Sequence, residues 1–159
     1  MFGDDIIIAD TPVPQQILDA FNQFQPVAVL ATQRVSDEET HLYGCIELKP
    51  GSENEMARIV EKPAPGTAPS NWVQTGHFIF TSELFDVLQG LEVGKGGELW
   101  LADAVDRLAA RSSVIVQPID GLWMAAGDPL RQIKANIEMA LRRDDMRDDL
   151  VAYLRTLKL

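Results

Sequence analysis

Residues 58–63 read Arg-Ile-Val-Glu-Lys-Pro, an apolar segment that ends in a carboxylate, an ammonium group and a proline. Proline has no N–H to donate to a neighbouring strand, so we expect Pro63 to end a β-strand. Glu61 and Lys62 would then lie at the end of a sheet, where α/β proteins commonly bind ligands. A carboxylate accepts hydrogen bonds from sugar hydroxyls, and a lysine offers a compact positive charge to a phosphate. The alternative is an exposed strand end that carries two solvated charges.

Apolar patterns on both sides of this stretch predict further strands and helices. We expect strands at 5–9, 27–31, 41–48, 56–60, 72–80 and 113–119, and helices after Pro12, at 82–88, at 98–110, from Pro129 and within 146–157. The helix after Pro12 is expected to present one apolar face, made of Ile17, Leu18, Phe21 and Phe24. The segment 27–31 is apolar on both faces, which is typical of sheets covered by helices. The pattern predicts a mixed α/β fold.

Composition limits the classes of protein and of partner. The 159 residues, 46% hydrophobic and 24% charged, fit one compact domain over residues 1–159. The net charge of −10 repels nucleic-acid phosphates and anionic lipids, so we expect neither nucleic acid nor a membrane as a partner. Cys45 is the single cysteine, and the sequence shows no signal-peptide pattern, which together favour a reducing cytoplasm. With only His41 and His77 beside it, Cys45 predicts no zinc-type site.

Several short motifs follow one another in a fixed order. They are Tyr43-Gly44, Pro-Ser-Asn-Trp at 69–72, Thr75-Gly76, Gly-Gly-Glu-Leu-Trp-Leu-Ala-Asp-Ala at 96–104 and Gly-Asp-Pro-Leu at 127–130. Together with residues 58–63 they resemble the C-terminal half of bacterial UTP–glucose-1-phosphate uridylyltransferases, within the sugar-phosphate nucleotidyltransferase family. The resemblance runs from Gly3 to about Tyr153. It implies a partial nucleotidyltransferase fold, a Rossmann-like mixed sheet flanked by helices and lacking the N-terminal nucleotide-binding strands.

The family's glycine-rich loop, which grips a nucleoside triphosphate through backbone N–H groups, has no counterpart in this sequence. The glycine cluster at 94–97 lies in mid-chain and precedes a predicted helix. The resemblance therefore implies a chain that supplies the sugar-phosphate side of the reaction of UTP with glucose 1-phosphate. It would be inactive alone and would need a separate polypeptide that carries the N-terminal half. The alternatives are a gene fragment, or a non-catalytic sugar-nucleotide-binding or oligomeric assembly module derived from the fold.

The resemblance also implies roles for individual residues. The Gly44 backbone and the Glu61 carboxylate would hold glucose hydroxyls, within a sugar phosphate or a UDP-sugar. Lys62 would meet the sugar-linked phosphate and is the candidate catalytic residue. Gly76 would let its strand pass close beneath the sugar ring. The alternative for Gly44 and Gly76 is that each marks a β-bulge.

A metal site is implied less completely. The family reaction uses Mg²⁺, and the resemblance places the first metal-binding aspartate at Asp4. The second stands two residues before the glycine that is Gly127 here, a position that Ala125 occupies and where it cannot bind a metal. Asp4 and Asp5 could equally be a solvated chain end. We expect Asp128 to cap the helix that Pro129 opens.

Two apolar segments predict self-association. Residues 6–8 and 27–31 are expected to present an open sheet edge and uncovered apolar faces, which another chain would cover. A homo-oligomer related by a two-fold axis is the simplest arrangement, and a monomer that repacks its own helices is the alternative. Trp72, Trp100 and Trp123 each lie beside apolar residues, which favours core or oligomer packing over sugar stacking.

Overall fold

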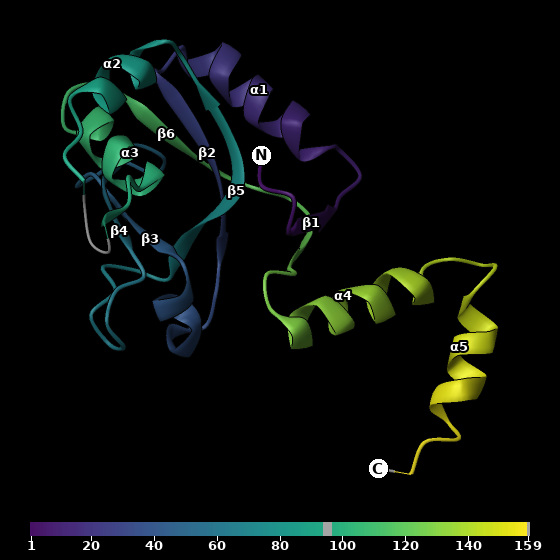
Figure 1. Cartoon of the computed structure of the whole chain (residues 1–159). Helices are drawn as coiled ribbons and strands as arrows, with labels where there is room; N and C mark the ends of the chain where they lie inside the picture. The colour runs from purple at the N-terminus through teal and green to yellow at the C-terminus, as the bar shows by residue number, and fades with distance from the viewer. Residues whose placement is uncertain (94–96, 159) are drawn as a thin grey trace. The chain divides into compact units, whose positions relative to one another are not determined.

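The computed structural model describes residues 1–93 and 97–158 (Figure 1). Contacts between residues divide the chain into two compact units. The first comprises Met1 and Ala9–Gly121, and the second comprises Phe2–Ile8 and Leu122–Leu159. The single domain over residues 1–159 stays a prediction.

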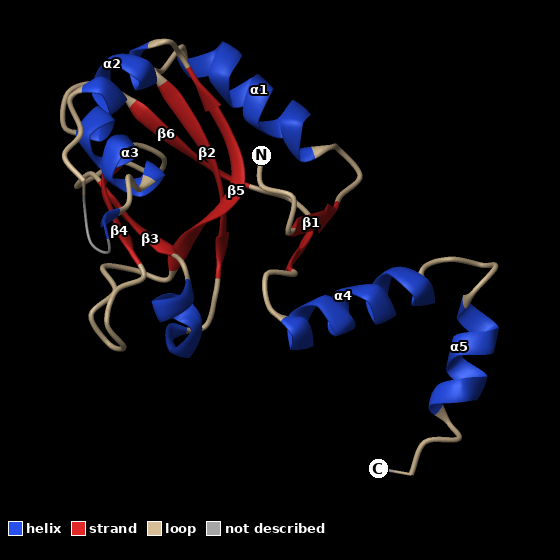
Figure 2. Ribbon diagram, in the orientation of Figure 1, coloured by secondary structure: helices blue, strands red, loops and turns tan. Residues whose placement is uncertain are grey.

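The first unit is built on a five-stranded mixed sheet with the order β4-β3-β5-β2-β6 (Figure 2). Its strands are β2 (Ala28–Arg34), β3 (Gly44–Leu48), β4 (Met56–Glu61), β5 (Trp72–Phe80) and β6 (Val114–Pro118). The pair β2–β6 is parallel, whereas β2–β5, β3–β4 and β3–β5 are antiparallel. The expected mixed α/β fold is therefore confirmed.

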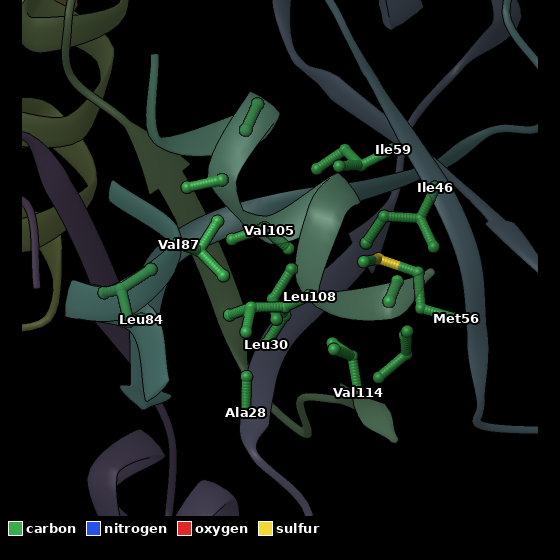
Figure 3. Packing of buried hydrophobic residues seen from close by; sticks show 14 residues of the cluster. Ala28, Leu30, Ile46, Met56, Ile59, Leu84, Val87, Val105, Leu108 and Val114 are labelled. Atoms are coloured by element: carbon green, nitrogen blue, oxygen red, sulfur yellow. The ribbon is translucent and has the colours of Figure 1, made fainter. Parts of the chain in front are cut away.

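Helices lie on both faces of this sheet. The helices of the unit are α1 (Val13–Phe24), the 3₁₀ helix η1 (Asp37–Leu42), α2 (Glu83–Gln89) and α3 (Leu101–Ala109). Figure 1 shows α1 on one side of the sheet and α2 and α3 on the other. The main apolar core lies beneath α2 and α3, where Leu30, Ile46 and Met56 meet Val105 and Leu108 (Figure 3).

The position of β2 corrects one expectation. Residues 27–31 were expected to form an open edge, but β2 lies inside the sheet, bonded to β5 on one side and to β6 on the other. Residues 28–31 are entirely buried, because Ala28 and Leu30 face the core under α2 and α3 and the alternate residues face away from it. This strand supplies no edge for a second chain, and homo-oligomerisation stays a prediction.

The apolar face of α1 differs from the expected one. Val13, Ile17 and Ala20 are buried, whereas Leu18 and Phe24 are each 42% exposed. The helix begins at Val13, directly after Pro12, and residues 13, 17 and 20 then follow one another at the spacing of a single helical stripe. The stripe that meets the sheet is thus narrower than the apolar pattern suggested.

The second unit contains a two-stranded antiparallel ribbon and two helices. Its elements are β1 (Asp5–Ile8), β7 (Leu122–Ala125), α4 (Pro129–Leu141) and α5 (Arg147–Leu154). As expected, Asp128 caps α4, because its carboxylate accepts hydrogen bonds from the N–H groups of Leu130 and Arg131, both at 3.0 Å. The strand β7 was not predicted, since its four residues show no clear alternation. Among residues 1–93 and 97–158, no helix is long and apolar enough to cross a membrane.

Candidate functional site

Three strands bring a carboxylate and an amide together over a glycine. Gly44 of β3 pairs with Glu61 of β4, and the neighbouring pair Cys45–Val73 places Gly44 beside Gln74 of β5. A Cβ atom added to Gly44 would stand 2.8 Å from both Gln74 Nε2 and Glu61 Oε2. Glycine suits this position because two side chains meet above its backbone, where a Cβ atom would displace them. Gln74 Nε2 in turn donates a long hydrogen bond of 3.4 Å to Glu61 Oε2.

Lys62 adopts an uncommon backbone conformation directly after β4. Its φ is 44°, in the left-handed region that few non-glycine residues adopt, and its N–H donates to the carbonyl oxygen of Tyr43 at 3.0 Å. This turn breaks the alternation of the strand. The Lys62 ammonium nitrogen lies 5.8 Å from the centre of the Trp100 ring, at the start of α3. Backbone conformations of this kind persist where the surroundings impose them, often at functional sites.

Burial and charge act on the Glu61 carboxyl in opposite directions. Burial raises the pKa of Glu61, the positive charge of Lys62 lowers it, and the negative charge of Asp103 in α3 raises it further. The carboxylate has thus lost part of its hydration, and hydroxyl groups of a ligand could replace that hydration as hydrogen-bond donors. Behind the site, burial and then the charge of Glu61 raise the pKa of the Cys45 thiol to about 11.

The structure brings three of the expected site residues together and leaves one apart. Gly44, Glu61 and Lys62 meet where β4 ends. Gly76 lies further along β5, within an irregularity between the pairs Leu30–Phe78 and Thr32–Gln74. The position of Gly76 is therefore that of the bulge alternative, whereas Gly44 lies in regular register. The sugar-binding and phosphate-binding roles of these residues stay predictions.

The metal positions implied by the resemblance lie in the second unit. Asp5 pairs directly with Ala125, and Asp4 Oδ2 lies 2.9 Å from the place where a Cβ of Gly127 would stand. The fold thus makes the two positions cross-strand neighbours, but Ala125 has no ligand atom. No group of three His, Cys, Asp or Glu side chains suited to a metal occurs in the described ranges 1–93 and 97–158. With alanine at one of the two implied positions, the residues present there do not fit a Mg²⁺ site held by two protein carboxylates.

The three tryptophans differ in their surroundings. Trp72 packs against the main core, as expected, and the Arg34 guanidinium carbon lies 4.5 Å from the centre of its ring. Trp123 donates its indole N–H to the Asp5 carboxylate. Trp100 lies beside Lys62, which sequence reasoning did not foresee.

Gln74 and Asp103 were also missed as neighbours of Glu61. Gln74 gave a signal, since an amide between Val73 and Thr75 is unusual in a strand with apolar ends. Asp103 gave none, because an acidic residue in the first turn of a helix is ordinary. The glycine cluster at 94–97 lies for the most part outside the described residues.

Comparisons with known proteins show which proteins this chain resembles. A UTP–glucose-1-phosphate uridylyltransferase of Staphylococcus epidermidis is 36% identical over 159 residues, which cover 99% of this chain and 55% of the relative. The enzyme of the same name from Bacillus subtilis is 35% identical, with coverages of 99% and 54%. A solved UDP-glucose pyrophosphorylase complexed with UDP-glucose matches with a TM-score of 0.82 at 30% identity, over 88% of this chain and 54% of that one.

The chain therefore spans about half the length of the relatives that it matches. Its assignment to their C-terminal half rests on the order of the motifs and stays a prediction. The family model described as nucleotidyl transferase matches residues 1–140, which include both the Glu61–Lys62 pair and the ribbon of β1 and β7. The chain belongs to the nucleotidyl transferase family.

Proposed function

We propose that this chain binds the sugar-phosphate part of the substrate in a uridylyltransferase reaction, in which UTP and glucose 1-phosphate give UDP-glucose and pyrophosphate. The observation that carries the proposal is the pair formed by Glu61 and Lys62. A partly buried carboxylate and an ammonium group of opposite charge leave the same strand end, and Gly44 leaves space above β3 for the Glu61 carboxylate.

In this proposal, Glu61 accepts hydrogen bonds from sugar hydroxyls, and Lys62 faces the phosphate. The reaction forms a bond between an oxygen of the sugar phosphate and the α-phosphorus of UTP, and pyrophosphate leaves. Its rate depends on alignment and on neutralising the charge on the phosphates. Glu61 would fix the sugar, and Lys62 would balance the charge of the attacking phosphate.

We further propose that the chain does not catalyse this reaction unaided. The resemblance implies two metal-binding carboxylates, and Ala125 stands in the place of one of them. A pyrophosphate-release assay with UTP, glucose 1-phosphate and Mg²⁺ should show no turnover above background. Turnover near the typical value of about 10 per second would contradict this part of the proposal.

Binding is tested by titrating glucose 1-phosphate and UDP-glucose, with detection by ligand-observed NMR. Glu61→Gln and Lys62→Met should each weaken binding by about tenfold or more, since a hydrogen bond to a charged group contributes about 1.5–3 kcal/mol. Glu47→Gln and Arg58→Gln are matched controls. They alter an exposed ion pair on the same β3–β4 hairpin, which should leave binding unchanged.

Two outcomes would contradict the sugar-phosphate proposal. If the Glu61 and Lys62 variants bind as tightly as the controls do, these residues are not the site. If neither ligand binds the unaltered chain at millimolar concentration, the non-catalytic assembly module is the better account.

A further inference from the structure

A row of four residues crosses the sheet at the level of the candidate site. Glu61 pairs with Gly44, Gly44 lies beside Gln74, and Gln74 pairs with Thr32 of β2. Residues paired directly across antiparallel strands point to the same face, with Cβ atoms about 4.5–5.5 Å apart. The polar groups of Glu61, Gln74 and Thr32 therefore line one face of the sheet, in sequence from β4 to β2.

Two atoms in this row are buried and lack a hydrogen-bond partner among the described residues. They are Gln74 Oε1 and Thr32 Oγ1, and Thr32 is entirely buried. Their chemistry is complementary, because a carboxamide oxygen accepts only, whereas a threonine hydroxyl can donate. Unpaired buried polar atoms destabilise a fold, so a single hydrogen bond between these two would satisfy both.

We propose that Thr32, Gln74 and Glu61 form a hydrogen-bond relay in which Gln74 is a positioning residue for the Glu61 carboxylate. In the relay, rotation of the Thr32 and Gln74 side chains brings Thr32 Oγ1–H to Gln74 Oε1, since both atoms are without a partner as they stand, and the bond fixes the orientation of the amide. Gln74 Nε2–H then donates to Glu61 Oε2, which holds one carboxylate oxygen and leaves the other for a ligand. This inference rests on the proposed function for its purpose, but the relay itself requires no ligand, and its Gln74–Glu61 bond is present in the unliganded chain.

Gly44 makes the relay geometrically possible. Any side chain at position 44 would occupy the space in which Gln74 Nε2 meets Glu61 Oε2. The charged groups that act on Glu61 are Lys62, which follows it, and Asp103 of α3, and Glu61 in turn acts on the Cys45 thiol of β3. All three stay in place in the variants below, so that a change in Glu61 reports on the relay.

The test measures the pKa of Glu61 in the full, unliganded chain by carboxyl ¹³C NMR, with the resonance assigned by its absence from Glu61→Gln. Gln74→Met keeps the length of the side chain and removes the donor, so the pKa of Glu61 should rise, because a hydrogen bond to the charged form has been lost. Thr32→Val removes only the hydroxyl and should move the pKa in the same direction by less. Thr32→Ser retains the hydroxyl and should restore the unaltered value. If Thr32→Val does not fold, Thr32→Ala provides the same comparison.

The sugar-phosphate affinity gives a second measurement. Gln74→Met and Thr32→Val should weaken binding of glucose 1-phosphate by about two- to tenfold, the loss expected for one neutral hydrogen bond. If the pKa of Glu61 is the same in Gln74→Met as in the unaltered chain, the relay is refuted. If Gln74→Met shifts it and Thr32→Val does not, the link to Thr32 is refuted. Because the pKa requires no ligand, a failure to bind glucose 1-phosphate would refute the proposed function and leave the relay supported.

Discussion

Replacing Gly44 by alanine should change the stability of the fold little but disrupt the contact between Gln74 and Glu61. The added carbon would stand 2.8 Å from Gln74 Nε2 and from Glu61 Oε2, about 0.6 Å inside the 3.4 Å at which ordinary van der Waals contact begins. Both atoms are the far ends of flexible side chains, so they can retreat. Such a movement would separate Gln74 Nε2 from Glu61 Oε2, which lie 3.4 Å apart in the unaltered chain.

The expected magnitude combines two opposing effects. Alanine is favoured over glycine in a strand by about 0.5–1 kcal/mol, because glycine loses more conformational freedom on folding. Overpacking of a filled space costs about 1–3 kcal/mol. We therefore expect Gly44→Ala to lower the free energy of unfolding, measured by urea denaturation, by about 1 kcal/mol. It should also abolish the influence of Gln74 on Glu61.

A double-mutant cycle isolates the clash between a side chain at position 44 and the Gln74 amide. In the background of Gln74→Ala one of the two clashing atoms is absent, so the cost of Gly44→Ala should fall by about 0.5–1.5 kcal/mol. Gly90→Ala is the matched control, because a carbon added there has only the Val87 carbonyl oxygen near it, at 3.9 Å. If the effects of Gly44→Ala and Gln74→Ala add to within about 0.3 kcal/mol, the two side chains do not compete for the space above Gly44 and the reasoning fails.

Three further predictions address other parts of the first unit. Cys45 is fully buried and its thiol pKa is raised to about 11, so Ellman's reagent at pH 8 should label it only as urea unfolds the chain; rapid labelling of the native protein would contradict its burial. Asp106 Oδ1 accepts a hydrogen bond from the Ile59 N–H at 3.0 Å and thereby links α3 to β4. Asp106→Ala should lower the free energy of unfolding, measured by urea denaturation, by about 1–3 kcal/mol, and Asp106→Asn, which keeps an acceptor, should lower it distinctly less. Equal losses in the two variants would argue against this bond. Burial raises the pKa of Glu61 above its usual 4.5, so the native state holds this proton to higher pH than the unfolded state does, and stability falls as the pH rises from 4.5 through the raised pKa. Glu61→Gln has no ionisable group at this position, so its stability relative to the unaltered chain should rise between pH 4 and pH 7. If the difference between the urea midpoints of the two proteins stays constant over this range, the Glu61 carboxyl is not desolvated.

Much of the first unit could be predicted because its apolar segments are strongly patterned. The strand at 72–80 was predicted with its observed bounds, and the hairpin of β3 and β4 follows from the turn at 49–52 between two apolar runs. Strand pairing was harder to predict, because a strand that is apolar on both faces suits the interior of a sheet or an uncovered edge equally well. The interior position of β2 depends on β6, which lies about 85 residues further along the chain.

In the candidate site too, the features set by local sequence could be predicted and those set by strand pairing could not. Glu61 and Lys62 are adjacent in sequence and end a strand, so their joint position could be predicted from local signals. Gln74 reaches Glu61 only because β3 lies between β4 and β5, and the order of strands in a sheet is not written in any one segment. The left-handed turn at Lys62 also left no mark in the sequence, since lysine carries no preference for that conformation.

The positive φ of Lys62 lowers the stability of the chain at a residue that carries a positive charge to the candidate site. A non-glycine residue in the left-handed region is strained by about 1 kcal/mol or more, and glycine at the same position would release that strain. Lys62→Gly should thus give a more stable chain in which the ammonium group beside Trp100 is lost. A selection for thermal stability alone would favour this replacement. In laboratory evolution of the chain toward heat resistance, Lys62 would therefore be replaced before residues of the core.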